Sequence, residues 1–168
     1  MSNDFVSQPC YSIIKVVMGG ILIKVERAQI KDHGIVSELL LKFAENQGWH
    51  AEIDRDRWDR VLAELLNSDG WLFLIAWEGE DPVGLAAVNF YLSLYGSREQ
   101  ARLQAIIVRS EHRRQKIGTR LVDEVLKAAR RRGCREIEAG VESYDSDTLS
   151  FCSNFDFEQK VMLTLRCV

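Results

Sequence analysis

The sequence predicts a single α/β domain in which helices flank a mixed, mostly antiparallel sheet. The chain has 168 residues, of which 46% are hydrophobic and only two are proline, so it can bury one sizeable core. Its apolar residues switch between strand-like and helix-like spacing in the order β-α-α-β-β-β-α-β-α-β, which is typical of a sheet covered by helices. No internal repeat and no low-complexity linker separates a second domain.

The first part of the chain predicts one strand and two helices. Ile21–Arg27 alternates apolar and charged residues, which indicates a strand. Asp32 and Asp54 are suited to cap the two helices that follow, because a short acidic side chain accepts hydrogen bonds from the free N–H groups of a helix start. The helices end near Gly48 and at Asp69-Gly70. Their apolar positions recur every three or four residues: Ile35, Val36, Leu39, Leu40 and Phe43, then Trp58, Val61, Leu62, Leu65 and Leu66.

The middle of the chain predicts a hairpin and a further strand. Trp71–Trp77 is a nearly continuous apolar run, and the turn residues 78–82 lead into a second run at Val83–Leu92. A polar loop at residues 95–99 is expected to precede a strand at Arg102–Val108.

The last part of the chain predicts a helix with two strands and a short helix after it. The longer helix ends at Arg130–Arg132 and Gly133. The arginines place positive charge at the negative end of the helix dipole. The glycine tolerates the left-handed backbone that often follows a helix. A strand at Glu136–Val141, a helix at Thr148–Asn154 and a strand at Val161–Arg166 complete the domain. The longer helix turns these residues inward: Ile117, Leu121, Val122, Val125, Leu126 and Ala129.

Charge and cysteine usage narrow the classes of partner. The formal net charge is −3, yet Arg109–Arg135 holds ten Lys/Arg and three Asp/Glu. A local basic patch on an acidic chain favours a discrete anionic ligand. Binding of nucleic acid by the Arg/Lys-rich helix is the less favoured interpretation. The four cysteines form no CxxC pair and the three histidines show no metal-ligand spacing. We therefore expect reduced thiols, a cytoplasmic location and no metal.

The amino terminus is expected to be neither a signal peptide nor an anchor. Its unbroken apolar stretch, Val16–Ile23, is far shorter than the roughly 20 residues of a membrane span. No contact with a membrane is expected. Residues 1–20 are predicted to form a flexible extension, with the domain proper at 21–168, and Met18 is an alternative start to Met1.

A strand that passes through a basic turn into a helix start lies at residues 106–119. Free N–H groups, the positive end of the helix dipole and cationic side chains together make a cradle for an anion. A pyrophosphate fits such a cradle, so the segment indicates a nucleotide-type cofactor. Lys116 occupies a position where glycine would be expected.

Two segments resemble the GNAT superfamily of acyl-CoA-dependent N-acetyltransferases. Arg113–Gly118 (RRQKIG) resembles the family's [Gln/Arg]-x-x-Gly-x-[Gly/Ala], and Leu149–Phe157 (LSFCSNFDF) is similar to its Ala-x-x-Phe-Tyr-x-x-x-Gly-Phe. The resemblance covers residues 21–168, with its motifs after Leu103. It implies a GNAT-like fold and acetyl-CoA as co-substrate.

The resemblance also implies which residues bind the CoA. Backbone amides from Gln115 to Thr119 would wrap the pyrophosphate, with charge added by Arg113 and Arg114. The Cβ of Lys116 could crowd the phosphates while its ammonium contacts one. Asp145 matches an asparagine that bonds the pantetheine, although Asp145 or Asp147 could equally cap the next helix. The implied set is Ile106, Ile107, Val108, Arg113, Arg114, Gln115, Lys116, Ile117, Gly118, Thr119 and Asp145.

The catalytic residues implied by the resemblance depart from the family's usual ones. A tyrosine often supplies the final proton, and here Cys152 holds that position. Cys152 is either the acid or a helix cysteine without a catalytic role, and Tyr144 could replace it. Gln104 occupies the position of a frequent glutamate base and could orient a water. Glu138 and Glu142 are alternative bases.

The implied activity is transfer of an acetyl group to a primary amine by direct transfer in a ternary complex. The acceptor is expected to be a small molecule or a peptide amine, and a homodimer is compatible with the family. Carboxylates between the two first helices suit a cationic amine, or simply cap the helices; they are Glu45, Glu52, Asp54 and Asp56, beside Trp49 and His50. The alternative function is an acyl-CoA-binding sensor or degenerate module without turnover.

Overall fold

Six strands form one sheet in the order in which they occur along the chain. The computed structural model describes residues 16–18, 21–46, 53–94, 98–141 and 145–160. The strands are β1 (Val16–Met18), β2 (Ile21–Arg27), β3 (Trp71–Glu78), β4 (Asp81–Ser93), β5 (Arg98–Val108) and β6 (Ile137–Ala139). The helices are α1 (His33–Asn46), α2 (Arg55–Leu66), α3 (Ile117–Arg131) and α4 (Ser146–Cys152).

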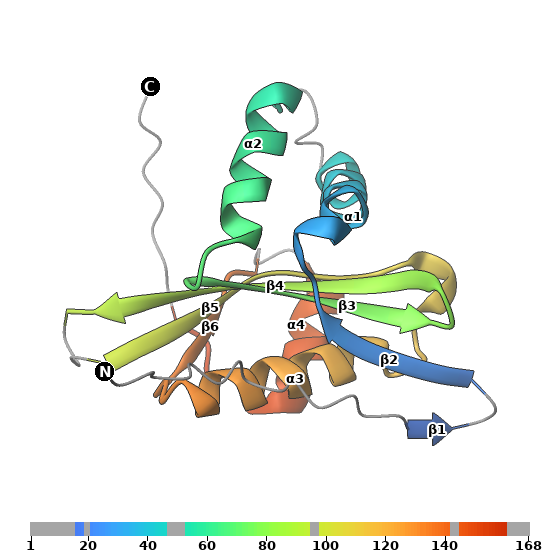
Figure 1. The fold of residues 1–168 in the computed structure, drawn as a ribbon. Helices are drawn as coiled ribbons and strands as arrows, with labels where there is room; N and C mark the ends of the chain where they lie inside the picture. Colours follow the sequence, from blue (N-terminus) through green and yellow to red (C-terminus); the bar gives the residue numbers. More distant parts are fainter. Residues whose placement is uncertain (1–15, 19–20, 47–52, 95–97, 142–144, 161–168) are drawn as a thin grey trace, which may run out of the picture.

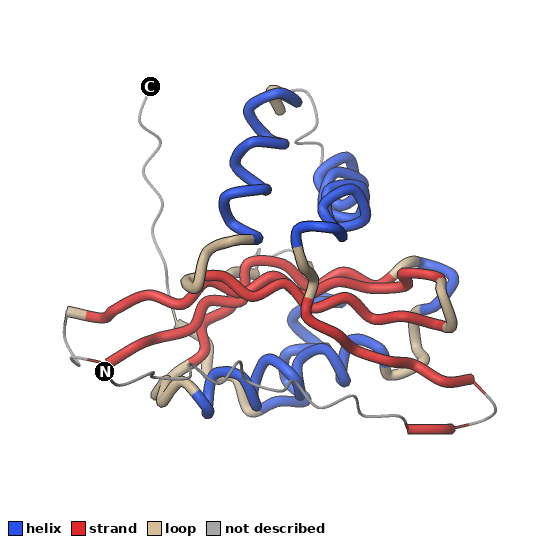
Figure 2. The backbone as a smooth tube through the Cα atoms, in the orientation of Figure 1, coloured by secondary structure: helices blue, strands red, loops and turns tan. Residues whose placement is uncertain are grey.

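The helices cover both faces of the sheet. Figure 1 shows α1 and α2 on one face and α3 and α4 on the other, and the tube in Figure 2 shows the same three layers. The first five strands pair antiparallel with their neighbours, whereas β5 and β6 are parallel. A parallel pair needs a long crossover, and α3 supplies it.

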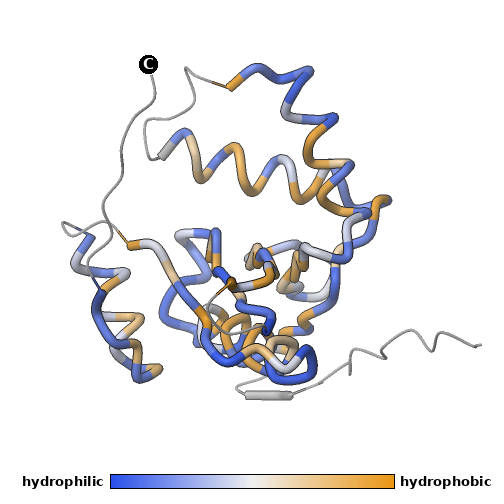
Figure 3. Tube along the Cα trace, turned by 90° about the vertical axis from the view of Figure 1, so that its left-hand side faces the viewer, coloured by the Kyte–Doolittle hydropathy of each residue, from blue (hydrophilic) through white to orange (hydrophobic). Residues whose placement is uncertain are grey.

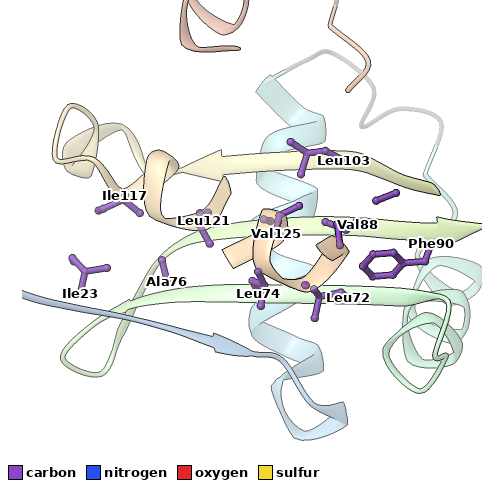
Figure 4. Packing of buried hydrophobic residues seen from close by; sticks show 14 of the residues in the cluster. Ile23, Leu72, Leu74, Ala76, Val88, Phe90, Leu103, Ile117, Leu121 and Val125 are labelled. Carbon is purple, nitrogen blue, oxygen red and sulfur yellow. The ribbon is translucent and has the colours of Figure 1, made fainter. Parts of the chain in front are cut away.

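Two clusters of buried side chains pack against the two faces. On the α3 face, Ile117, Leu121 and Val125 lie over strand residues such as Leu74 and Val88 (Figure 4). On the other face, α1 and α2 are coloured alternately apolar and polar along their length in Figure 3, as expected for helices with one buried face. Their contributions to the core are Val36, Leu39, Leu62 and Leu66, packed against Phe73, Ile75, Leu85 and Ala87.

Most predicted elements are confirmed, including the strand Ile21–Arg27, the β3–β4 hairpin and the cap at Asp54, which accepts a hydrogen bond from the Arg57 N–H at 3.2 Å. Asp32 does not cap α1. It ends a single 3-10 turn, and its carboxylate accepts the Gln29 N–H at 2.8 Å. In α3, Ala128 is buried and Leu126 is half-buried, because Ala128 also lies on the stripe that faces the sheet.

Strand β5 begins at Arg98, earlier than predicted. Its polar first residues pair with the end of β4, and Glu99 forms a two-bond ion pair with Arg132 at 2.7 and 2.8 Å. Polar side chains are compatible with a strand wherever its edge is exposed. The polar composition of residues 98–99 therefore led to the wrong prediction of a loop. Strand β1, which no pattern predicted, lies inside the expected extension 1–20. The predicted strand Val161–Arg166 lies outside the described residues.

No helix in the described ranges is long and apolar enough to cross a membrane.

Gly84 on β4 lets α3 approach the sheet closely. A Cβ on Gly84 would lie 2.9 Å from the Ile107 carbonyl oxygen and 3.3 Å from side-chain atoms of Ile117 and Leu121. The first contact is with backbone and cannot relax by rotating a side chain. The absence of a side chain at this position therefore sets the distance between helix and sheet.

Gly84→Ala is expected to lower the free energy of unfolding by about 1–3 kcal/mol, the usual cost of overpacking a core. Urea unfolding followed by circular dichroism measures it. Gly34→Ala in α1 is the matched control, because a Cβ there has nothing within 4 Å. Equal unfolding midpoints for Gly84→Ala and the wild-type protein would contradict the packing role.

Candidate functional site

The sheet opens where β5 continues past β6. The β5–β6 ladder joins Ala101 to Ile137, Arg102 to Glu138 and Leu103 to Ala139. On its other side β5 stays paired with β4 as far as Val108. In the described part of the chain, residues 104–108 therefore have a strand neighbour on one side only.

A β-bulge lies at the same point. Ala87 pairs with Ala105 and Val88 pairs with Leu103, so Gln104 is skipped in the β4–β5 register. Bulges often stand next to active sites, where they end pairing or redirect a side chain. Gln104 is exposed, as a residue that meets a ligand must be. The bulge thus brings one predicted catalytic residue to the opening of the sheet.

Beyond the bulge, the β5 side chains belong to the core. Ile106 and Val108 pack on the α3 cluster, and Ile107 packs on the α1–α2 cluster. These side chains are half-buried, and contact of the Ile106 and Val108 backbone with a ligand stays a prediction.

The turn from β5 to α3 has an unusual backbone. After a 3-10 turn at Ser110–His112, both Arg114 and Lys116 are left-handed, with φ of 63° and 59°. The first i to i−4 bond of the helix joins the Arg120 N–H to the Lys116 carbonyl at 3.1 Å. The N–H groups before Arg120 lie at the helix start, where no intrahelical acceptor exists. A cluster of such groups forms a concave anion site.

The side chains of this turn separate into core and solvent. Ile117, the first residue of α3, is buried against the sheet, and Thr119 is half-buried. The cationic residues are exposed, and the Arg113 guanidinium donates to the Val108 carbonyl at 3.4 Å. The predicted residues open to a ligand are Arg113, Arg114, Gln115 and Lys116.

Lys116 holds a conformation that suits glycine. A left-handed backbone costs most residues about 1 kcal/mol or more, whereas glycine adopts it freely. The side chain of Lys116 makes no cap bond to α3. The backbone conformation alone would therefore favour glycine at this position.

His112 was not predicted to matter and is the link between this turn and β3. Its Nε2 lies 2.9 Å from a carboxylate oxygen of Glu78, the last residue of β3. Its Nδ1 is, among the described side chains, the buried polar atom without a hydrogen-bond partner. Only the fold brings residues 78 and 112 together, so no local pattern could have shown the pair.

Asp145 is the N-cap of α4, which begins at Ser146. One carboxylate oxygen accepts the Thr148 N–H at 3.0 Å and the other accepts the Thr148 hydroxyl at 2.6 Å. These bonds lower the pKa of Asp145. The capping alternative is thus present in the structure, with Asp145 rather than Asp147 as the cap. The pantetheine contact of Asp145 stays a prediction.

Cys152 ends α4 and is half-buried. Burial raises the pKa of its thiol, and the negative charge of Asp145 raises it further. A raised pKa lowers the fraction of thiolate, which disfavours a nucleophile. Tyr144 and Glu142, the other catalytic candidates of this region, lie outside the described residues.

Glu138, a candidate base, is held by two partners. Its Oε2 accepts from the Tyr91 hydroxyl at 2.8 Å and from the Arg102 guanidinium at 2.8 and 3.2 Å. The bonds from Arg102 and Tyr91 lower the pKa of Glu138, while burial and the bond to Glu138 raise the pKa of Tyr91. A carboxylate held in this way is a weak base. Sequence reasoning missed Tyr91 and Arg102, because only the strand register places them beside Glu138.

Two hollows adjoin these elements. A cleft of about 1000 Å³ lies between α3, β6 and residues 155–160, and both Gln104 and Glu138 line it. A shallow groove of about 540 Å³ lies between α1 and α2, where Glu45 and Asp59 face Lys42 and Arg55. The groove thus carries both positive and negative side chains, rather than the acidic lining expected for a cationic amine. Asp54 caps α2, and residues 49–52 lie outside the described ranges.

The chain matches a family model and several solved structures. The family model described as "Acetyltransferase (GNAT) family" matches residues 33–157. An aminoglycoside acetyltransferase from an uncultured soil metagenomic sample, in complex with sisomicin, is 20% identical with a TM-score of 0.77, over 87% of this chain and 96% of that one. No curated protein matches this chain significantly.

Two further solved structures share the fold. A ribosomal-protein-alanine N-acetyltransferase from Brucella melitensis biovar Abortus 2308 is 14% identical with a TM-score of 0.69, over 87% of this chain and 99% of that one. A transcriptional regulator from Bacillus halodurans C-125 is 21% identical with a TM-score of 0.74, over 86% and 99%.

Asp145→Ala is expected to lower the melting temperature at pH 7, and the difference from wild type should shrink as the pH falls. The pKa of Asp145 is lowered in the folded state, so its contribution to stability is present above the ordinary aspartate pKa of about 3.9 and is lost on acidification below it. Thermal unfolding between pH 3 and 7 measures this. Asp147→Ala is the control, and a difference that stays constant with pH would contradict the cap.

Proposed function

Because the chain belongs to the acetyltransferase (GNAT) family and is an acyltransferase, we propose that it transfers an acetyl group from acetyl-CoA to a primary amine. One observation carries the proposal. The bulge at Gln104 and the end of the β5–β6 ladder open the sheet at one point, and the open edge leads directly into the left-handed turn at the start of α3. Acetyl-CoA carries a thioester and a pyrophosphate that are joined by an extended arm. The thioester matches the opening of the sheet, and the pyrophosphate matches the left-handed turn.

The turn holds the pyrophosphate and the open edge holds the arm. Backbone N–H groups of Gln115–Thr119 bind the phosphate oxygens, with charge from Arg113 and Arg114. The free edge at Ile106–Val108 pairs with the amide groups of the pantetheine, as an added strand would. Lys116 reaches a phosphate with its ammonium, while its Cβ narrows the cradle.

The opening of the sheet places the reacting carbonyl. Transfer requires a neutral amine beside the thioester, and hydrogen-bond donors for the negative charge that develops on its oxygen. Backbone groups at the Gln104 bulge lie outside the regular ladder and supply such donors. The Gln104 side chain orients a water that removes the amine proton, because an amide cannot accept that proton itself.

Cys152 donates the proton that the leaving thiolate needs. An ordinary cysteine thiol already carries its proton at neutral pH, and burial raises the pKa of Cys152 further. The same property disfavours a covalent acetyl-enzyme, so the transfer is direct within a ternary complex. Glu138 is excluded from our assignment of the base, since Arg102 and Tyr91 lower its pKa.

The acceptor is a small molecule or a peptide amine. Two solved structures of the same fold are named for acceptors of these classes. One is an aminoglycoside acetyltransferase, and the other is a ribosomal-protein-alanine N-acetyltransferase. These identities are low, so both classes belong in the first panel of acceptors. Use of acetyl-CoA is consistent with a cytoplasmic enzyme.

The test is release of CoA from acetyl-CoA in the presence of aminoglycosides, polyamines and peptides with a free amino-terminal alanine. The protein is first shown to bind acetyl-CoA by isothermal titration calorimetry. We expect turnover with at least one class of amine. Binding without turnover on any amine would favour the acyl-CoA sensor, and absence of binding would contradict both.

Cys152→Ala is expected to lower kcat by about 100-fold or more, the usual contribution of a general acid, with little change in the KM for acetyl-CoA. Steady-state kinetics on the best acceptor measure both constants. Cys152→Ser serves as the matched variant, because a hydroxyl keeps a proton but donates it less readily. Unchanged turnover in Cys152→Ala would show that the thiol has no catalytic role.

A further inference from the structure

Gly118 provides the space in which the ring of Phe151 lies. A Cβ on Gly118 would approach the Cε2 and Cζ atoms of Phe151 to 3.2 Å, and a methyl of Val108 to 3.8 Å. Gly118 is not among the residues with positive φ, so its backbone conformation does not require glycine. The residue is small because α4 rests on it. The two sequence segments that resemble the family, far apart in the chain, thus touch at one residue.

This contact joins α4 to the start of α3. The helix has seven residues and none of them is fully buried. A helix of this length has little stability of its own, so its position depends on what it packs against. The Phe151 ring also packs edge to face on Phe155, with centroids 5.1 Å apart. Cys152 is the next residue after this ring.

We propose that Phe151 is a positioning residue, which couples the occupation of the α3 turn by a pyrophosphate to the placement of the Cys152 thiol. The inference rests on the proposed function. A phosphate bound at the N–H groups of residues 115–119 holds Gly118 in place, and Gly118 forms the surface beneath the ring. A ligand that stabilises this surface therefore also stabilises α4 in its docked position. Coupling of this kind is reciprocal between the two sites.

The experiment measures how fast iodoacetamide alkylates Cys152 in the full chain, with and without 3′-phospho-ADP. This probe carries the pyrophosphate and nucleotide of CoA but has no pantetheine arm, so it cannot cover the thiol directly. Alkylation of each cysteine is read by peptide mass spectrometry. Cys134 is the internal reference, because it is half-buried at the opposite end of α3.

In the wild-type protein, saturating 3′-phospho-ADP is expected to slow alkylation of Cys152 at least about fivefold, the lower end of usual allosteric couplings. The rate at Cys134 should stay unchanged. Phe151→Leu, which keeps an apolar side chain but removes the ring, should lose most of this protection at a nucleotide concentration that saturates the variant. It should also lower kcat more than it raises the KM for acetyl-CoA.

A second variant approaches the contact from the other side. Gly118→Ala pushes the ring away and should lose protection too, whereas Gly118→Ala combined with Phe151→Leu should regain part of it, because the smaller side chain leaves room for the methyl group. A non-additive result is the signature of residues in contact. Circular dichroism and thermal unfolding verify that each variant is folded.

Equal protection of Cys152 in the wild-type protein and in folded Phe151→Leu would overturn the inference. Absence of protection in a wild-type protein saturated with 3′-phospho-ADP would overturn it as well. A wild-type protein that binds neither this nucleotide nor acetyl-CoA would instead contradict the proposed function, on which the inference depends.

Discussion

The close packing of α3 on β4 at Gly84 is the constraint on which the rest of the structure depends. Ile117 and Leu121 lie against a position without a side chain, and the neighbouring residue across the ladder is Val108, the last of β5. The start of the helix is therefore held at the end of the strand. This arrangement forces the chain between them into a tight turn, and the left-handed residues Arg114 and Lys116 are its result.

The sheet opens on the strand that leads into this helix. Helix α3 returns the chain to β6, which pairs with β5 only as far as Leu103. The bulge at Gln104 follows directly, and from there to Val108 β5 pairs with β4 alone within the described residues. Turn, open edge and bulge are thus consecutive on one strand–helix connection, and a single extended ligand can meet all three.

The charged groups near the opening of the sheet make structural contacts, and they also shift the pKa values of their neighbours. Arg102 and Tyr91 hold Glu138 and lower its pKa, which makes this carboxylate a link between three strands rather than a base. Asp145 caps α4 and also raises the pKa of Cys152, so one carboxylate serves the helix and the thiol together. The cap at Asp145 is one of the two roles that the sequence left open for this residue, and its contact with the pantetheine stays a prediction.

By itself, the sequence determined the order and kind of the elements from β2 to α4, because hydrophobic period, caps and charge act over a few neighbouring residues. It also predicts an anion site at residues 113–119. It also indicated the family, through two short motifs. Only the tertiary structure decided which distant residues meet: the bulge at Gln104, the ring of Phe151 on Gly118, and Tyr91 and Arg102 around Glu138. These contacts depend on strand register and on the distance between helix and sheet, which are set by packing across the whole domain rather than by any local pattern.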